Sequence, residues 1–243
     1  MQVSVFGLGH AGSVAAGCLA AQGHDVIAFD QDLSKTDLIR RGMGPVREPG
    51  LDALIKESVG AGKLTVTTNI ASGIENSALS NIFSATSYRP HADRDLVELT
   101  GLCRQIGVAL ATKTKFHSIV FRTTLPQGAT RGALIPALER ASGKRVGVDF
   151  GVAIYPTFLR HGTAIQDCIN PSAILVGVTD DETLARLREM DIAVQAPELV
   201  VDLAEAEAMT RAGGVWPVPS ETAEKEQPSL AGFAIAATNL GSC

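Results

Sequence analysis

The sequence predicts an α/β fold with a doubly wound parallel sheet, and three observations support this. Short apolar runs typical of strands alternate with amphipathic, helix-like segments along most of the 243 residues. This alternation is typical of a parallel sheet covered by helices on both faces. A glycine-rich turn joins the first strand-like run to the first helix-like segment. The pattern changes after about residue 203, where a good helix former is followed by closely spaced glycines and prolines and the sheet-forming region is expected to end.

The individual elements follow from the spacing of apolar residues, which recur at three to four positions in helices and fill short runs in buried strands. Strands are expected over 2–6, 25–29, 64–68, 79–85, 117–123, 148–154 and 173–178, with 199–203 as a candidate for the last. Helices are expected over 11–22, 51–59, 95–106, 128–141 and 181–190. The sequence contains no internal repeat.

The last forty residues differ from the rest of the chain. A helix is expected over 204–212, but helix-breaking residues follow it: Gly213, Gly214, Pro217, Pro219 and Pro228. We therefore predict a sheet domain over 1–203. The remainder, 204–243, is predicted to be a short, truncated C-terminal helical segment and linker.

Composition excludes several classes of protein. The net charge of −5 provides no basic surface for nucleic acid. No apolar run reaches the roughly 18 residues that a membrane helix needs, and no signal peptide is recognisable. The four cysteines, Cys18, Cys103, Cys168 and Cys243, are widely spaced and form no CxxC pair. The sequence therefore predicts neither a metal site nor a disulfide framework. A cytoplasmic protein with reduced thiols and no metal is expected.

The glycine-rich turn carries the clearest functional signal. The segment Gly7-Leu8-Gly9-His10-Ala11-Gly12 matches G-x-G-x-x-G, and it follows a predicted strand and opens a predicted helix. In dinucleotide-binding folds of the Rossmann type, the first glycine allows the tight turn. The second lets the backbone approach a pyrophosphate, and the third allows close packing of helix on strand. We assign these roles to Gly7, Gly9 and Gly12.

The cofactor predicted from these residues is NAD. Asp30 ends the second expected strand, 23 residues after Gly7. A carboxylate at this place accepts hydrogen bonds from the ribose hydroxyls of the adenosine and repels a 2′-phosphate. The sequence therefore favours NAD over NADP.

Beyond the glycine turn, the chain resembles the UDP-glucose/GDP-mannose 6-dehydrogenase family, and most closely its GDP-mannose branch. The resemblance rests on five segments: 3–12, 45–55 with Glu48-Pro49-Gly50-Leu51, 122–128, 143–160 and 163–165. It implies an NAD-dependent oxidoreductase acting on CH–OH. The implied reaction is oxidation of a sugar nucleotide to the uronate, a precursor for polysaccharide synthesis, in two successive steps.

The resemblance also implies a set of cofactor-binding residues. These are Gly7, Gly9, His10, Ala11 and Gly12 in the turn, together with Asp30, Lys35, Thr86 and Thr124. His10 stands where the family usually has an aromatic residue.

The catalytic positions depart from the family's pattern. In the family, a cysteine thiolate captures the aldehyde, and water hydrolyses the resulting thioester with the help of a carboxylate. Here Thr157 and His161 replace two glutamates within 155–161. Thr210 and Gly214 stand where a lysine and an asparagine stabilise the oxyanion in the family. These departures predict impaired activity.

The family's nucleophile corresponds to Cys243, in the sequence Gly241-Ser242-Cys243. The family's second, nucleotide-sugar-binding domain is expected to be absent. An adjacent terminal carboxylate would raise the pKa of the Cys243 thiol. Cys18 and Cys103 lie within predicted helices and are expected to belong to the core.

Three hypotheses remain open from the sequence. The first is a working nucleotide-sugar 6-dehydrogenase, possible as a homo-oligomer or with a partner chain that completes the site. The second is a non-catalytic NAD-binding pseudoenzyme or a decayed copy. The third, weaker, is a different reductase that uses His161 or Tyr155 as the acid.

Overall fold

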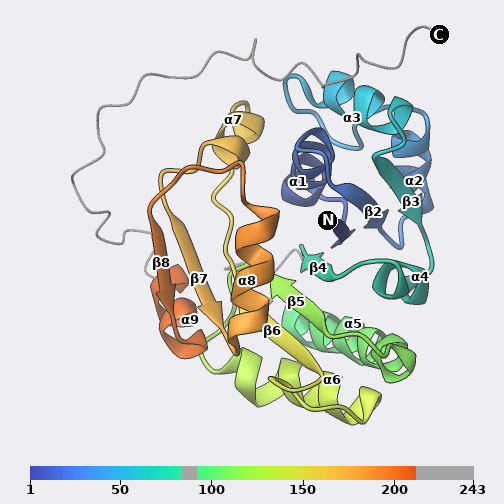
Figure 1. Ribbon diagram of the computed structural model, residues 1–243. Coiled ribbons are helices and arrows are strands. Elements are labelled where there is room, and N and C mark those ends of the chain that lie inside the picture. The colour runs from blue at the N-terminus through green and yellow to red at the C-terminus, as the bar shows by residue number, and fades with distance from the viewer. Residues whose placement is uncertain (84–91, 212–243) are drawn as a thin grey trace, which may run out of the picture.

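Eight strands form one sheet in the order β3-β2-β1-β4-β5-β6-β7-β8 (Figure 1). The computed structural model describes residues 1–83 and 92–211, and the numbers of strands and helices given below refer to those residues. The strands are β1 (Gln2–Phe6), β2 (Asp25–Phe29), β3 (Leu64–Thr67), β4 (Leu79–Ile82), β5 (His117–Phe121), β6 (Phe150–Ile154), β7 (Ile174–Val178) and β8 (Glu198–Val201).

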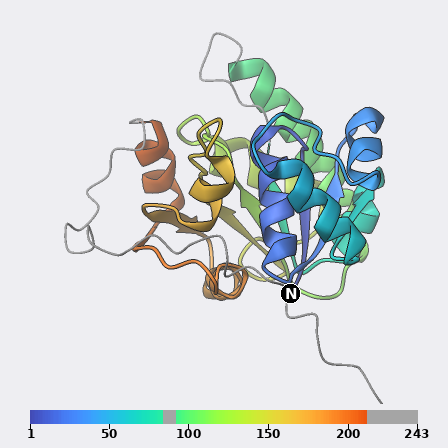
Figure 2. The same cartoon turned by 90° about the horizontal axis from the view of Figure 1, so that it is seen from above.

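Helices cover both faces of this sheet, in two layers that each have their own core. One layer holds α1 (His10–Ala21), α2 (Leu33–Arg40), α3 (Leu51–Gly60), α7 (Ala164–Ile169) and α8 (Asp181–Met190). The other holds α4 (Ile70–Glu75), α5 (Ala92–Thr112), the π-helical turn η1 (Thr130–Leu134), α6 (Ile135–Ser142) and α9 (Leu203–Arg211). Figure 2 shows α1, in blue, and α5, in green, on opposite sides of the strands.

Side chains of each central strand alternate between the two cores. In β1, Val3 and Val5 pack into the core beneath α1, whereas Phe6 packs into the core beneath α5. In β6, Ala153 joins the first core, and its neighbours Val152 and Ile154 join the second. Because both faces are buried, the strands are apolar almost throughout, as in other doubly wound sheets. The predicted fold class is confirmed.

Two strands, β7 and β8, run against the expected direction. β6 and β7 pair antiparallel, with Ala153 opposite Val178, whereas β7 and β8 are parallel again. A parallel connection would need a helix that crosses back over the sheet. The connecting helix α7 has only six residues and spans about 9 Å, so it cannot return the chain to the opposite edge. The chain therefore turns back, and the sheet is mixed rather than wholly parallel.

Three short helices, α2, α4 and α7, are absent from the elements expected from sequence. Two of them follow capping residues. Asp32 accepts a hydrogen bond from the Ser34 N–H ahead of α2, and Asn69 accepts one from the Ala71 N–H ahead of α4. Such caps are a local helix-start signal. Two other elements differ in length: α5 is longer than the expected 95–106, and β4 ends before the expected residue 85.

The carboxyl-terminal helix of the described region packs closely on the sheet. A Cβ atom on Gly177 of β7 would lie 2.6 Å from the Cβ of Ala206 in α9. The buried carboxylate of Glu207 accepts hydrogen bonds from the backbone N–H groups of Gly128 and Thr130, the latter at 2.8 Å. α9 is thereby anchored to the start of η1. A division of the chain at residue 203 remains a prediction.

No helix within residues 1–83 and 92–211 combines the length and apolar character needed to cross a membrane.

Candidate functional site

A cleft of about 890 Å³ lies where several strands end. Its lining includes the residues that directly follow β1, β2, β4 and β5, namely Gly7, Asp30, Phe83 and Arg122. The order of the strands reverses between β1 and β4, which makes this edge the topological switch point of the sheet. Ligands of open α/β sheets bind in the crevice at this point, outside the carboxyl ends of the strands.

The glycine turn packs so tightly that two of its positions have no room for a side chain. Gly7 has a φ of +96°, and a Cβ atom on it would lie 1.9 Å from the carbonyl oxygen of Phe83. A Cβ atom on Gly12 would lie 1.8 Å from the carbonyl oxygen of Gly7. These contacts bring the first turn of α1 directly against the end of β1.

The second glycine of the motif, Gly9, faces open space instead. No heavy atom lies within 4 Å of the position that a Cβ atom on Gly9 would take. Gly9 is the N-cap of α1, and no side chain caps the helix there. The first N–H groups of a helix lack partners within the helix and carry the positive end of its dipole. The residues present therefore fit a phosphate group that approaches the backbone at Gly9.

Asp30 is held at the edge of the cleft by three donors. Its Oδ2 accepts the Leu8 N–H at 2.6 Å and lies 3.1 Å from the Lys35 ammonium. Its Oδ1 accepts the Asp32 N–H at 2.9 Å. An ionised carboxylate offers about four acceptor positions, so it keeps one for a hydroxyl group in the cleft.

The predicted cofactor residues converge on this one cleft. Eight of them line it: Gly7, Gly9, His10, Ala11, Gly12, Asp30, Lys35 and Thr124. Thr86 lies outside the described residues. The cleft also contains residues that the sequence did not single out, including Gln31, Phe83, Arg122 and Thr123. Their position directly after the end of a strand is the signal that could have found them.

Arg122 separates this cleft from a second one of about 780 Å³. Its guanidinium carbon lies 3.7 Å from the centroid of the Tyr155 ring, a cation–π contact. Its Nε donates a hydrogen bond to the Thr157 hydroxyl at 3.3 Å. Arg122, Pro156 and Thr157 line both clefts, so the two clefts adjoin.

The catalytic candidates are only partly placed. Thr157 lies at the boundary of the two clefts, and its hydroxyl donates to the carbonyl oxygen of Arg122 at 3.3 Å. As a threonine, it provides no carboxylate there. Thr210 is buried, and its hydroxyl donates to the Glu207 carbonyl oxygen at 2.8 Å. Gly214 and Cys243 lie outside the described residues. Burial raises the pKa of the Tyr155 hydroxyl, which weakens this residue as an acid.

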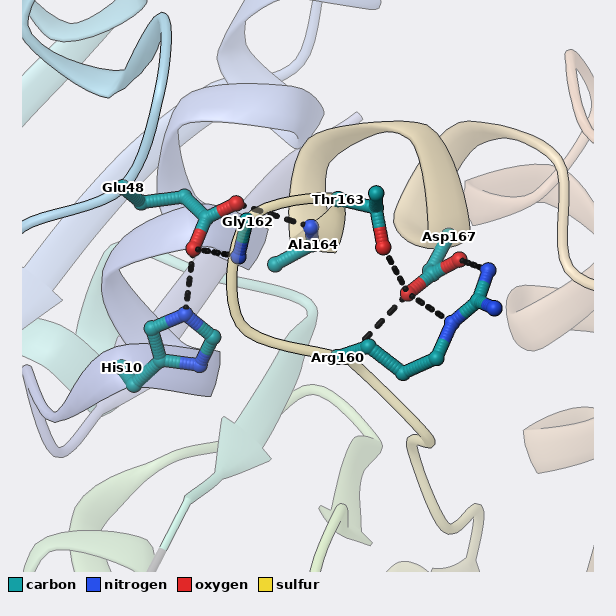
Figure 3. Close-up of polar contacts among 7 residues, drawn as sticks. All are labelled: His10, Glu48, Arg160, Gly162, Thr163, Ala164 and Asp167. Atoms are coloured by element: carbon teal, nitrogen blue, oxygen red, sulfur yellow. Dashed lines mark hydrogen bonds and ion pairs between the residues drawn. The ribbon is translucent and has the colours of Figure 1, made fainter.

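The structure reveals a carboxylate that connects three segments of the chain (Figure 3). Glu48 accepts hydrogen bonds from His10 Nε2 at 2.8 Å, from the Gly162 N–H at 3.0 Å and from the Ala164 N–H at 2.9 Å. The bond from His10 contributes most to holding the pKa of Glu48 down at about 2, with backbone bonds adding to it. Sequence analysis placed Glu48 in a matching segment but assigned it no role. Its partners are distant in sequence, and no local pattern indicates them.

The loop before α7 is fixed by a second carboxylate, also drawn in Figure 3. Asp167 accepts from the backbone N–H of Arg160 at 2.9 Å, from its guanidinium at 2.6 Å and from the Thr163 hydroxyl at 3.1 Å. The Arg160 guanidinium is the main cause of the lowered pKa of Asp167. Gly162 and Ala164 are thus held in place to bond Glu48.

The sheet order, the glycine turn and the cleft together define a dinucleotide-binding domain of the Rossmann type. Comparison with known proteins gives the family. Residues 1–192 match the NAD binding domain of the UDP-glucose/GDP-mannose dehydrogenase family. The chain belongs to this family.

Several members are similar to the chain. A GDP-mannose 6-dehydrogenase of Pseudomonas savastanoi pv. phaseolicola is 39% identical over 231 residues, which cover 95% of this chain and 53% of that protein. The crystal structure of a ternary complex of GDP-mannose dehydrogenase from Pseudomonas aeruginosa has a TM-score of 0.85 at 39% identity, covering 89% of this chain and 50% of that one.

A UDP-glucose dehydrogenase from Pyrobaculum islandicum has a TM-score of 0.81 at 31% identity, covering 87% of this chain and 48% of that one. The chain spans about half the length of the curated relatives it matches.

Proposed function

We propose that this chain binds NAD in the 890 Å³ cleft and supplies the cofactor half of a sugar-nucleotide oxidation. The observation that carries the proposal is the convergence of the glycine turn and Asp30 on one cleft at the switch point of the sheet. When bound, NAD supplies the hydride acceptor. The similarity to proteins named GDP-mannose 6-dehydrogenase and UDP-glucose 6-dehydrogenase supports a sugar nucleotide such as GDP-mannose or UDP-glucose as the substrate.

Each part of the cleft has a distinct task in this proposal. The backbone at Gly9 and the first turn of α1 bind the pyrophosphate. Asp30 accepts hydrogen bonds from the adenosine ribose, while Lys35 neutralises part of its charge at 3.1 Å. Thr124 lies on the wall beyond the end of β5.

The second cleft supports a place for the substrate. Hydride transfer requires that the reacting atoms approach to about 3–3.5 Å, so the two ligands must meet. The clefts adjoin at Arg122, Pro156 and Thr157, and the reacting carbon of the sugar would lie at this boundary. Arg122 is then positioned to contact a ligand in either cleft.

We propose further that activity is impaired at the hydrolytic step. Thr157 has no carboxylate to activate water, and its hydroxyl is bonded to Arg122. Cys243 remains the proposed nucleophile. The alternative function, NAD binding without turnover, is favoured by the same observation at Thr157. In either case a partner chain or a second copy could complete the substrate side.

Titration with NAD, followed by an assay for NADH with GDP-mannose and with UDP-glucose, tests these proposals. Two NADH per sugar over many turnovers would show that both oxidations and the hydrolysis occur, and would contradict impairment. A burst of no more than two NADH per chain would place the block at hydrolysis. Saturable NAD binding without NADH would support the non-catalytic alternative. Absence of NAD binding by the folded chain would overturn the proposed function itself.

A further inference from the structure

Two histidines and a glutamate meet beside the glycine turn. His10 begins α1, Glu48 precedes α3, and His161 lies in the loop before α7. One potential ligand atom from each of the three side chains lies within 4.8 Å of the other two. The rings of His10 and His161 are in contact, with their centroids 3.9 Å apart and their planes tilted by 36°.

The two histidines come from segments far apart in the chain. The chain has five histidines in 243 residues, and two of them, His10 and His161, contact each other beside one carboxylate. Residues 151 positions apart in sequence therefore form one local set of donor atoms.

We propose that His10, Glu48 and His161 bind a divalent first-row transition metal ion, with Zn²⁺ as the reference ion. Two imidazole nitrogens and one carboxylate oxygen form a three-ligand set that zinc accepts in sites with an open position. Imidazole also suits copper, nickel and iron, whereas magnesium and calcium prefer oxygen ligands. The fourth position is available to water or to a ligand.

The distances are compatible with such an ion after a small adjustment. Tetrahedral ligands at about 2.0–2.1 Å from zinc lie roughly 3.3 Å from one another. His10 Nε2 and Glu48 Oε2 are 2.8 Å apart, so the ion would take the place of the proton they share. His161 is exposed and lies on a loop, so its side chain can rotate to close the remaining gap.

The surroundings of Glu48 supply the support that metal sites need. Its side chain is only 1% exposed. The Gly162 N–H bonds Oε2, the oxygen that faces His10, and the Ala164 N–H bonds Oε1, so that both oxygens are held in place. Groups of this kind, which hold a ligand in place, commonly contribute tenfold or more to metal affinity. The positive end of the α1 dipole opposes a cation at His10, and the charge of Glu48 offsets it.

Metal binding is tested on the full chain without a histidine tag and without NAD. Calorimetric titration with ZnCl₂ at pH 7.5 is expected to show one ion per chain. Addition of Co²⁺ should give the visible absorption bands of a centre with nitrogen and oxygen ligands. His161→Gln removes an exposed ligand and should weaken Zn²⁺ binding at least about tenfold, with unchanged circular dichroism.

Two further variants make the outcome decisive. His10→Phe keeps an aromatic ring but removes the nitrogen ligand, and it should also weaken Zn²⁺ binding at least about tenfold. His24→Gln is the matched control, because His24 lies 3.2 Å from the amino terminus and could bind an ion there instead. The proposal is overturned if the chain binds no stoichiometric Zn²⁺. It is equally overturned if only His24→Gln weakens binding.

Discussion

The Asp30 carboxylate accepts the backbone N–H of Leu8 at 2.6 Å, so that the end of β2 is tied directly to the glycine turn after β1. This bond fixes the position of the proposed ribose acceptor, Asp30, relative to the proposed phosphate site at the glycine turn. Two further donors, the Asp32 N–H and the Lys35 ammonium, hold the same carboxylate in the cleft. Asp30 is therefore a structural link as well as the proposed ligand contact.

Removing the charge of Asp30 should change the affinities for NAD and NADP by different amounts. In Asp30→Asn, the affinity for NAD is expected to fall about tenfold or more, because a hydrogen bond to a charged group contributes roughly 1.5–3 kcal/mol. The affinity for NADP should fall less, since the repulsion of its 2′-phosphate is removed. Calorimetric titration with each dinucleotide measures this. Asp37→Asn, on the exposed part of α2, is the control, and equal losses for both cofactors would contradict the assignment.

The glycines of the turn should respond in opposite ways. Gly9→Ala places its Cβ in open space, so the free energy of unfolding should change by less than about 0.5 kcal/mol while NAD affinity drops. Gly12→Ala places its Cβ 1.8 Å from the Gly7 carbonyl oxygen and should destabilise the fold by about 1–3 kcal/mol or more. Urea unfolding and NAD titration of both variants are the measurements. A stable Gly9→Ala variant with full NAD affinity would count against a phosphate site there.

Glu207 should be important for stability. Its buried carboxylate satisfies the N–H groups of Gly128 and Thr130, which removal of the side chain would leave without these acceptors. Glu207→Ala is expected to lower the free energy of unfolding by about 2–4 kcal/mol. Glu207→Gln keeps one acceptor oxygen and should lose less. Urea unfolding of both variants checks the order, and Glu189→Ala, at an exposed position of α8, should be close to neutral.

A buried histidine gives the stability a dependence on pH. Burial, with smaller effects from the Lys113 and Arg186 cations, lowers the pKa of His117 to about 3. The unfolded chain takes up this proton near pH 6.5, but the folded chain does so only near pH 3. Stability is therefore complete above pH 6.5 and falls with decreasing pH in that window, by up to about 1.4 kcal/mol per pH unit.

The variant His117→Gln isolates this contribution. Its amide can still bond Ser80, the partner of His117 Nε2 at 2.8 Å. Between pH 7 and pH 5.5, the unchanged chain should lose about 1 kcal/mol more stability than the variant, as measured by urea unfolding. Parallel losses in both proteins would show that His117 does not titrate in this way.

Much of the fold was accessible from local patterns. Apolar periodicity predicted the eight strand positions and most long helices, and the glycine turn with Asp30 predicted the cofactor edge. These signals are local because backbone geometry and turn chemistry depend on neighbouring residues. The caps Asp32 and Asn69 were equally local, and they could have revealed α2 and α4.

Other features depend on contacts between distant segments. The reversal of β7 depends on α7 being too short to cross the sheet. The meeting of Glu48 with His10 and Gly162 joins positions 38 and 114 residues apart. No periodicity encodes such a contact, because it arises only when helices from separate parts of the chain pack on the same face. Local sequence therefore determines the residue types and the edge of the sheet with the glycine turn. Packing decides that His10 and His161 meet beside Glu48 and that Arg122 lies between two clefts.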